Sequence, residues 1–334
     1  MRKILLGFAV LLVIGAGVYM RSHSRKPPVE VAYAGNRQVT LYSTTAQVRE
    51  PIAVANFGDR LEVLQRFQDQ VNVRTPHGVA GWVSERELLS PDVWLRAKDL
   101  EARAAGMSIE ARGHTKVLTN LHLEPGRDTP RLRQLPKAVP LDFLLREPLP
   151  VPVAHTPGAD EDNAGEPAQE RREDWWLVRA RADTGALSGW ILGRFAELDV
   201  PAPLPDYTSS AGMRIVGWFE LNHVTDASGA AHAQYLVVGA HGPEGQPCDF
   251  TSQRVYTWGA KRQRYETAFV ESKLCGRLPV KVLQTGAAKG SPEVTFAFTD
   301  IASGRPEERT YHMYQTVVRR VREGSASARK KPPR

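Results

Sequence analysis

Hydrophobic and polar residues alternate over short distances along most of the chain, which predicts antiparallel β structure. Between residues 38 and 90, short apolar runs such as VTLYS and LEVLQRF are separated by turns that contain glycine. A period of two with frequent turn residues is typical of small β barrels. The same pattern returns over 107–199 and over 211–322. The sequence therefore predicts a mostly β fold, with two small barrels followed by a C-terminal antiparallel β domain.

A single helix is predicted between the first two β regions, over 91–106. Ser90-Pro91-Asp92 combines a hydroxyl cap, a proline at the first helical position and an acid near the positive end of the helix dipole. Apolar residues then recur at helical spacing, and Gly106 ends the helix. We expect a linker helix that packs one apolar face against a barrel. The apolar positions are Val93, Trp94, Ala97, Leu100 and Ala104.

The two barrel regions close on the same short sequence, which indicates an internal repeat. Gly81-Trp82 stands in GWVSERELL, and Gly189-Trp190 stands in GWILGRFAEL. We expect each glycine to permit a tight turn at a barrel corner. We expect each tryptophan to seal the end of a barrel that has little other core.

This repeat resembles the bacterial SH3-like (SH3b) domain. The second copy supplies LHLEPGRDTP, AVPLDFL, DWWLVRA and LSGWILGRFAEL, and the first copy supplies GDRLEVL and VNVRTPHGVAGWV. The resemblance implies two SH3-like barrels, over 38–90 and 107–199, in a membrane-anchored protein whose C-terminal β domain has no assigned role. It also implies that the barrels bind cell-wall peptidoglycan or a partner's peptide.

The second barrel carries a long insertion, 148–173, next to a pair of tryptophans. The insertion is rich in proline and acidic residues and has few large apolar groups, so we expect it to be disordered. Trp175 and Trp176 follow it directly. Because neighbours in a strand face opposite sides, one indole is expected in the core and the other at the surface as a ligand contact. In the alternative interpretation, the insertion folds over the exposed ring.

The N-terminus predicts membrane insertion. Between Ile4 and Met20 there are 17 residues without a charge, and basic residues flank them. This length suits a transmembrane helix, and small residues are lacking where a cleaved signal peptide would need them. We expect a signal-anchor over 1–26, a stalk over 27–37, and the body on the periplasmic side of the inner membrane. A cleaved signal peptide stays open as the alternative.

The positive charge of the chain is concentrated at its two ends. The whole chain carries +7, and the N-terminal segment and residues 319–334 together carry +11, so residues 27–318 carry −4. A phosphate-binding surface needs clustered basic residues. We therefore expect no nucleic-acid partner, and we expect 323–334 to be a disordered basic tail.

Two cysteines are the strongest candidates for chemistry. In an exported protein, Cys248 and Cys275 are expected to form one disulfide across a hairpin. The alternative is a cysteine nucleophile of the NlpC/P60 kind, paired with His312, but neither cysteine lies at a predicted helix start. No metal-ligand spacing and no nucleotide-binding loop is present. We expect no catalytic residue, no metal and no cofactor, and hence no enzyme.

These observations favour a non-enzymatic envelope protein that binds the glycan or peptide of the cell wall, or an envelope partner. A cell-wall hydrolase or accessory subunit, with its activity in the C-terminal domain, is the first alternative. A protein–protein adaptor, with the proline-rich insertion as ligand, is the second.

Overall fold

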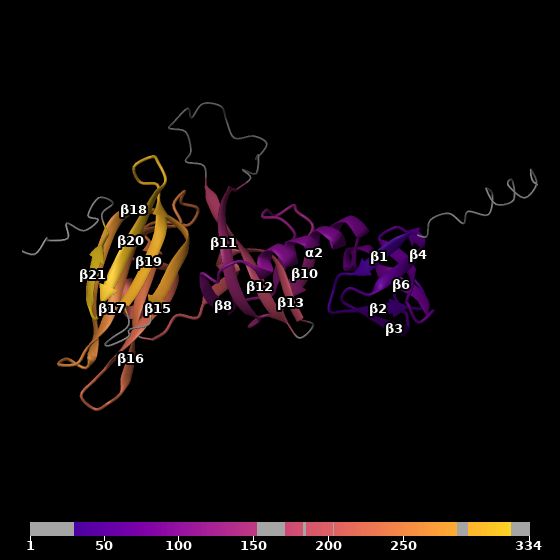
Figure 1. Cartoon of the computed structure of the whole chain (residues 1–334). Helices are drawn as coiled ribbons and strands as arrows, with labels where there is room; N and C mark the ends of the chain where they lie inside the picture. Colours follow the sequence, from indigo (N-terminus) through magenta and orange to yellow (C-terminus); the bar gives the residue numbers. More distant parts are fainter. Residues whose placement is uncertain (1–29, 152–170, 183–184, 203, 286–292, 322–334) are drawn as a thin grey trace, which may run out of the picture. The chain divides into compact units, whose positions relative to one another are not determined.

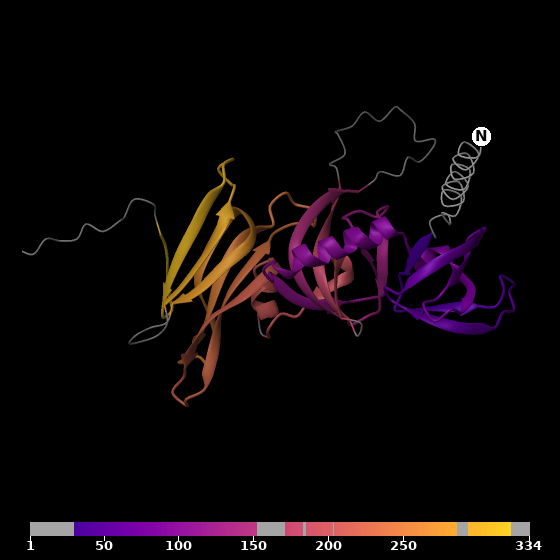
Figure 2. The ribbon, with the colours of Figure 1, turned by 45° about the vertical axis from the view of Figure 1, so that its right-hand side comes forward.

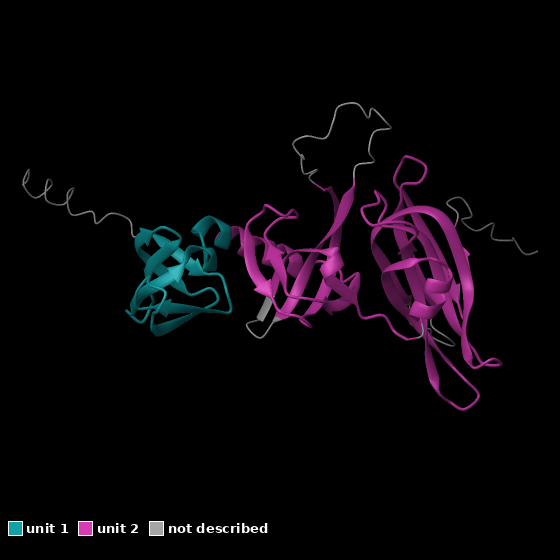
Figure 3. Ribbon diagram, turned by 180° about the vertical axis from the view of Figure 1, so that it is seen from behind, with its two compact units in different colours: residues 1–94 teal, residues 95–334 magenta. Residues whose placement is uncertain are grey.

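The computed structural model describes residues 30–151, 171–182, 185–202, 204–285 and 293–321 (Figure 1). These residues form three antiparallel sheets of seven strands each, so the predicted mostly β fold is confirmed. The chain divides into two compact units, Met1–Trp94 and Leu95–Arg334, which Figure 3 distinguishes by colour. The first unit contains one sheet, and the second unit contains the other two.

The predicted transmembrane helix is corrected. Among the described residues, no helix is both long enough and apolar enough to cross a membrane. The longest of them, α2 (Pro91–Ala105), has 15 residues and carries charged side chains along its length. A bilayer requires roughly 20 apolar residues. The predicted span 1–26 and the predicted tail 323–334 lie outside the described residues.

The first repeat sheet follows the strand order β3-β2-β6-β5-β4-β1-β7. Alternation puts the core on one face of its strands, formed by Val39, Leu41, Leu61, Val71, Val73 and Val83. β1 lies inside the predicted stalk 27–37 and pairs with β4 and β7, so the sheet begins before residue 38. The strands are β1 (Val31–Ala34), β2 (Gln38–Tyr42), β3 (Pro51–Asn56), β4 (Arg60–Phe67), β5 (Gln70–Arg74), β6 (Ala80–Ser84) and β7 (Leu88–Leu89).

The second repeat sheet has the same topology as the first. Its order is β10-β9-β13-β12-β11-β8-β14, which is the first order with seven added to each number. In both sheets a 3₁₀ turn precedes the last strand, η1 (Glu85–Glu87) and η2 (Gly193–Phe195). The internal repeat is therefore structural. The strands are β8 (Ala111–Thr115), β9 (Thr119–His122), β10 (Arg131–Leu135), β11 (Pro140–Pro150), β12 (Arg172–Ala182), β13 (Gly185–Leu192) and β14 (Ala196–Leu198).

The predicted insertion 148–173 is partly strand. β11 extends to Pro150, and β12 begins at Arg172, where these two residues pair. The two strands thus continue their ladder into both ends of the insertion. Residues 152–170 lie outside the described residues.

The predicted linker helix is present as α2. The Ser90 hydroxyl accepts a hydrogen bond from the Val93 backbone amide at 3.3 Å, as expected for an N-cap. At the other end, Arg179 of β12 donates to the Ala104 carbonyl at 2.6 Å and satisfies a terminal acceptor. The buried face of α2 consists of Ala97, Leu100 and Ala104.

The C-terminal sheet is a simple meander in which the strands pair in sequence order (Figure 2). A hairpin joins β17 to β18, with Gly259 opposite Arg264. A short helix, α3 (Leu204–Ser210), precedes the sheet. The strands are β15 (Arg214–Thr225), β16 (Ala231–Ala240), β17 (Phe250–Gly259), β18 (Arg264–Thr285), β19 (Glu293–Asp300), β20 (Glu307–Tyr314) and β21 (Val317–Arg320).

The repeated glycines serve a different purpose from the predicted turn. Gly81 and Gly189 lie within β6 and β13, and neither has a positive φ. A Cβ at Gly189 would lie 2.6 Å from Leu121 Cγ and 2.8 Å from the His122 carbonyl oxygen. A Cβ at Gly81 would lie 3.0 Å from the carbonyl oxygen of Tyr42, which is the equivalent contact in the first repeat. The glycines therefore allow two strands to cross closely.

Replacement of Gly189 by alanine is expected to lower the free energy of unfolding by about 1–3 kcal/mol, because the added methyl group overpacks the crossing of β9 and β13. Gly106→Ala is the control, since a Cβ there meets nothing within 4 Å. Urea unfolding of both variants measures the difference. Equal stability of the two variants would contradict the close-crossing role.

Candidate functional site

The motif tryptophans occupy matching strand positions but differ in burial. Trp190 of β13 is buried, whereas Trp82 of β6 is only half-buried. Val83, beside Trp82, belongs to the core of the first repeat. Because neighbours alternate, Trp82 points to the opposite side of β6. Trp82 therefore does not seal the interior of the first repeat.

Both predicted ligand-contact tryptophans are buried, with 3% of Trp175 and 7% of Trp176 exposed. The rings of Trp175 and His122 pack edge-to-face, with their centroids 5.5 Å apart. His122 Nδ1 lies 3.1 Å from the Thr129 carbonyl oxygen. Burial lowers the pKa of His122 below its usual value, so this imidazole is neutral at neutral pH. On the other face of β12, the rings of Trp176 and Phe143 pack edge-to-face, with their centroids 5.4 Å apart. The expected exposed indole is absent because both faces of β12 are covered.

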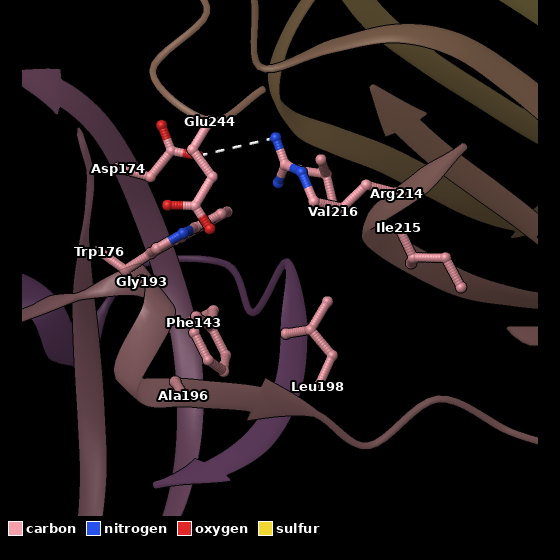
Figure 4. A pocket seen from close by; sticks show the side chains of 10 residues that line it. All are labelled: Phe143, Asp174, Trp176, Gly193, Ala196, Leu198, Arg214, Ile215, Val216 and Glu244. Atoms are coloured by element: carbon pink, nitrogen blue, oxygen red, sulfur yellow. Dashed lines mark ion pairs between the residues drawn. The ribbon is translucent and has the colours of Figure 1, made fainter. Parts of the chain in front are cut away.

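Trp176 nevertheless lines a cavity of about 180 Å³ (Figure 4). The second repeat contributes an aromatic and aliphatic wall, and β15 of the C-terminal sheet contributes the opposite wall. Asp174, Arg214 and Glu244 bring charge to the same space. A hollow that combines apolar walls with a few charged groups is typical of a small-ligand site. The remaining lining residues are Phe143, Gly193, Ala196, Leu198, Ile215 and Val216.

A buried ion-pair network lies beside the cavity. The Arg146 guanidinium donates to Asp174 Oδ1 at 2.6 Å and to Asp249 Oδ1 at 3.0 Å. The three side chains are 1%, 2% and 7% exposed, in that order. Arg146 also donates to the carbonyl oxygens of Gln246 and Cys248. The network therefore fixes the segment before β17 against the second repeat.

Arg214 lies close to Asp174 but makes no hydrogen bond with it. Asp174 Oδ1 accepts hydrogen bonds from Arg146 and from the Gly245 amide, while Oδ2 lies 3.8 Å from Arg214 Nη2. That separation is too long for a hydrogen bond. Arg214 Nε is buried and has no hydrogen-bond partner among the described residues. Arg214 is therefore paired with Asp174 by charge, without a hydrogen bond between the two side chains.

Gly193 keeps space for the edge of the Trp176 ring. A Cβ at this position would lie 3.1 Å from Trp176 Cδ1 and 3.1 Å from the Asp174 carbonyl oxygen. Gly81 pairs with Val73 in the first repeat, and Gly189 pairs with Val178 in the second. Val71 and Trp176 each lie two residues before these partners, so the first repeat has Val71 at the position of Trp176. The cavity wall is thus specific to the second repeat.

The two cysteines form the disulfide Cys248–Cys275, which joins the start of the β17–β18 hairpin to its second strand. Neither cysteine is free, so the chain offers no thiol for the NlpC/P60-type alternative. His312 instead lies near Glu293 and Thr295. Among the described residues, no group of three His, Cys, Asp or Glu side chains could hold a metal ion.

Comparison with known proteins gives no family assignment. No family model and no curated protein matches the chain. NlpC1 from Trichomonas vaginalis matches with 11% identity and a TM-score of 0.18, over 73% of this chain and 89% of that chain. An NlpC/P60 family protein from Bacillus cereus matches with 12% identity and a TM-score of 0.21, over 71% of this chain and 93% of that chain.

These matches correct one prediction. The sequence led us to expect no enzyme and left a cell-wall hydrolase as an alternative, yet the solved structures that the chain matches carry the NlpC and NlpC/P60 names. The prediction that the chain is not an enzyme is therefore withdrawn. The TM-scores of 0.18 to 0.21 are too low for these matches to assign an activity to the chain.

Proposed function

We propose that this chain is an extracytoplasmic protein that binds the carboxylate end of a short peptide, of the kind found in cell-wall peptides, in the cavity beside Trp176. The observation that carries the proposal is Arg214, which lines the cavity and whose Nη2 lies 3.8 Å from Asp174 Oδ2, too far for a hydrogen bond. A guanidinium is well suited to bidentate binding of a carboxylate. A ligand carboxylate would therefore supply the acceptor that Arg214 lacks.

The rest of the cavity suits the remainder of such a peptide. Trp176, Phe143 and Val216 offer apolar surface for a small side chain. Glu244 is exposed and lines the same space, where it can pair with an amino group. Figure 4 shows Glu244 and Arg214 approaching the cavity from different sides. Opposite charges at two sides of one hollow complement a zwitterionic ligand.

One further observation supports a location outside the cytoplasm, and another supports a ligand from the cell wall. The disulfide Cys248–Cys275 is the kind of bond that persists in an oxidising compartment. The sequence resemblance of both repeats to SH3b domains favours a ligand from the cell wall. Display of two such repeats on the envelope surface, with a wall peptide as partner, is part of the proposal.

Titration calorimetry with D-alanyl-D-alanine and with its C-terminal amide tests the proposal. The free acid is expected to bind at least about tenfold more tightly than the amide, because a charge-assisted hydrogen bond contributes about 1.5–3 kcal/mol. Arg214→Gln should abolish this preference. Arg181→Gln, at an arginine that is 54% exposed and does not line the cavity, should leave the preference unchanged.

Equal affinity for the acid and the amide would contradict the proposal, and so would an unchanged preference in Arg214→Gln. Mass spectrometry of the recovered peptide adds a second readout. Cleavage products that depend on the protein would favour the hydrolase alternative over a binding protein.

A further inference from the structure

The cavity beside Trp176 brings together two opposite charges from its two walls. Asp174 lines the cavity from β12, and Arg214 lines it from β15. Figure 4 shows the ion pair that joins these two side chains, with Asp174 Oδ2 3.8 Å from Arg214 Nη2. The two groups thus face each other at the cavity, but they are too far apart for a hydrogen bond.

Asp174 offers an oxygen that the described residues do not use. Its side chain is only 2% exposed. Both hydrogen bonds that it accepts go to Oδ1, from Arg146 at 2.6 Å and from the Gly245 amide at 2.9 Å. These two bonds fix the carboxylate, and Oδ2 accepts no hydrogen bond from the described residues. A buried polar atom without a partner calls for an explanation, and a ligand that donates a hydrogen bond provides one.

The charges that line the cavity show which donor fits. Two acids, Asp174 and Glu244, and one base, Arg214, give the lining a net charge of −1. A ligand with a carboxylate alone, bound to Arg214, would make this −2 and would place like charges beside each other at Asp174 Oδ2. Such a juxtaposition is costly. A ligand that also carries an ammonium group leaves the charge unchanged and supplies the donor.

The separation of the two protein groups limits how far apart the two ligand groups can be. A hydrogen bond spans about 2.9 Å between heavy atoms. Since Asp174 Oδ2 and Arg214 Nη2 are 3.8 Å apart, an ammonium on the first and a carboxylate on the second must be close neighbours. In an α-amino acid both groups are attached to one carbon. In a dipeptide, a peptide unit separates them.

We infer that the cavity recognises an α-amino acid group, in which the ammonium and the carboxylate share one carbon. Arg214 binds the carboxylate, Asp174 Oδ2 accepts from the ammonium, and Glu244 is a second acceptor. The inference rests on the proposed function, because Arg214 binds a carboxylate in both, and it specifies the residue that carries this carboxylate. A free amino acid has such a group, and so does a terminal residue that is joined to a peptide through its side chain.

Titration calorimetry on the full chain with two isomers of acetyl-lysine tests the inference, each in its L and D form. Nε-acetyl-lysine keeps the ammonium and the carboxylate on one carbon, whereas Nα-acetyl-lysine separates them by the side chain. In at least one form, the Nε isomer is expected to bind at least about tenfold more tightly, because only its ammonium reaches Asp174. Alanine distinguishes the two sources: if it binds and Nε-acetyl-lysine does not, the ligand is a free amino acid.

Two variants separate the ammonium from the carboxylate. In Asp174→Asn, the amide oxygen is needed by Arg146 and Gly245, so the amide nitrogen replaces Oδ2 and cannot accept a hydrogen bond. This variant should lose the preference between the isomers but keep the preference for D-alanyl-D-alanine over its amide. Arg181→Gln should keep both preferences. Near-UV circular dichroism checks that each variant is folded.

The outcomes distinguish this inference from the proposed function. A preference for the acid over the amide, without tighter binding of alanine or Nε-acetyl-lysine than of Nα-acetyl-lysine, overturns the inference alone. An isomer preference that persists in folded Asp174→Asn also overturns it. If the acid preference and the isomer preference are both absent, the proposed function fails as well.

Discussion

Replacement of Arg146 by methionine is expected to lower the free energy of unfolding by about 3–5 kcal/mol, the largest effect of any single change considered for this chain. The side chain is 1% exposed and is bonded to two carboxylates, Asp174 and Asp249, which are themselves buried. Its removal leaves both carboxylates without their main partner in a region that excludes water. Arg214 and Arg277 remain near them, at 3.8 Å and 3.5 Å, and offset part of the loss.

Urea unfolding of Arg146→Met and of a matched control measures this effect. Arg181→Met is the control, because Arg181 also pairs with a buried aspartate, Asp142, but is 54% exposed. Arg181→Met should lower the free energy of unfolding by less than about 1 kcal/mol. Addition of Asp174→Asn and Asp249→Asn to Arg146→Met should restore part of the stability, since no buried charge is then left unpaired. A loss in Arg146→Met no larger than that of the control would show that the network contributes little.

The same variant reports on the connection between the second repeat and the C-terminal sheet. Arg146 belongs to β11, while Gln246, Cys248 and Asp249 precede β17. Without Arg146, the two sheets are expected to unfold in separate steps, because less energy couples them. Differential scanning calorimetry would show one more transition for Arg146→Met than for the parent chain.

The fold was largely predictable because it depends on local pattern. Alternation marked the β regions, and the Gly-Trp pairs marked the repeat that the strand orders now show. The reason for the glycines was not predictable. Gly189 is required by Leu121 and His122, which are far from it in sequence and belong to another strand. The strand β1 was missed because four residues are too few to show a pattern.

The candidate sites were less predictable because distant segments form them. Trp176 was singled out, but alternation alone could not show that β15 lies opposite it and supplies Arg214. Arg146 and Asp174 carried a usable signal, since each is a charged residue directly beside a run of apolar residues, at FLLR and DWWLV. Such residues are rarely buried unless paired. The identity of the partner, however, depends on the tertiary fold.

The contribution of Glu110 to stability is expected to fall as the pH rises through the window from 4.5 to about 7. Burial raises the pKa of this carboxyl from 4.5 to about 7; the Val280 amide opposes the shift, and the charge of Asp249 adds to it. The folded chain therefore retains this proton up to about pH 7, whereas the unfolded chain loses it near 4.5. Because the folded state binds more protons in this window, the free energy of unfolding decreases as the pH rises. A pKa difference of this size corresponds to about 3 kcal/mol.

Glu110→Gln isolates this contribution, because the amide resembles the protonated carboxyl and does not ionise. Urea unfolding at pH 8 should find the variant more stable than the parent chain by about 2–3 kcal/mol, and at pH 5 the difference should vanish or reverse. Glu220→Gln is the control, since the side chain of Glu220 is 48% exposed. That control should keep the pH dependence of the parent chain. If the parent chain and Glu110→Gln respond to pH alike, Glu110 is charged in the folded protein at neutral pH, and its buried Oε1 must then have a partner that stabilises the charge.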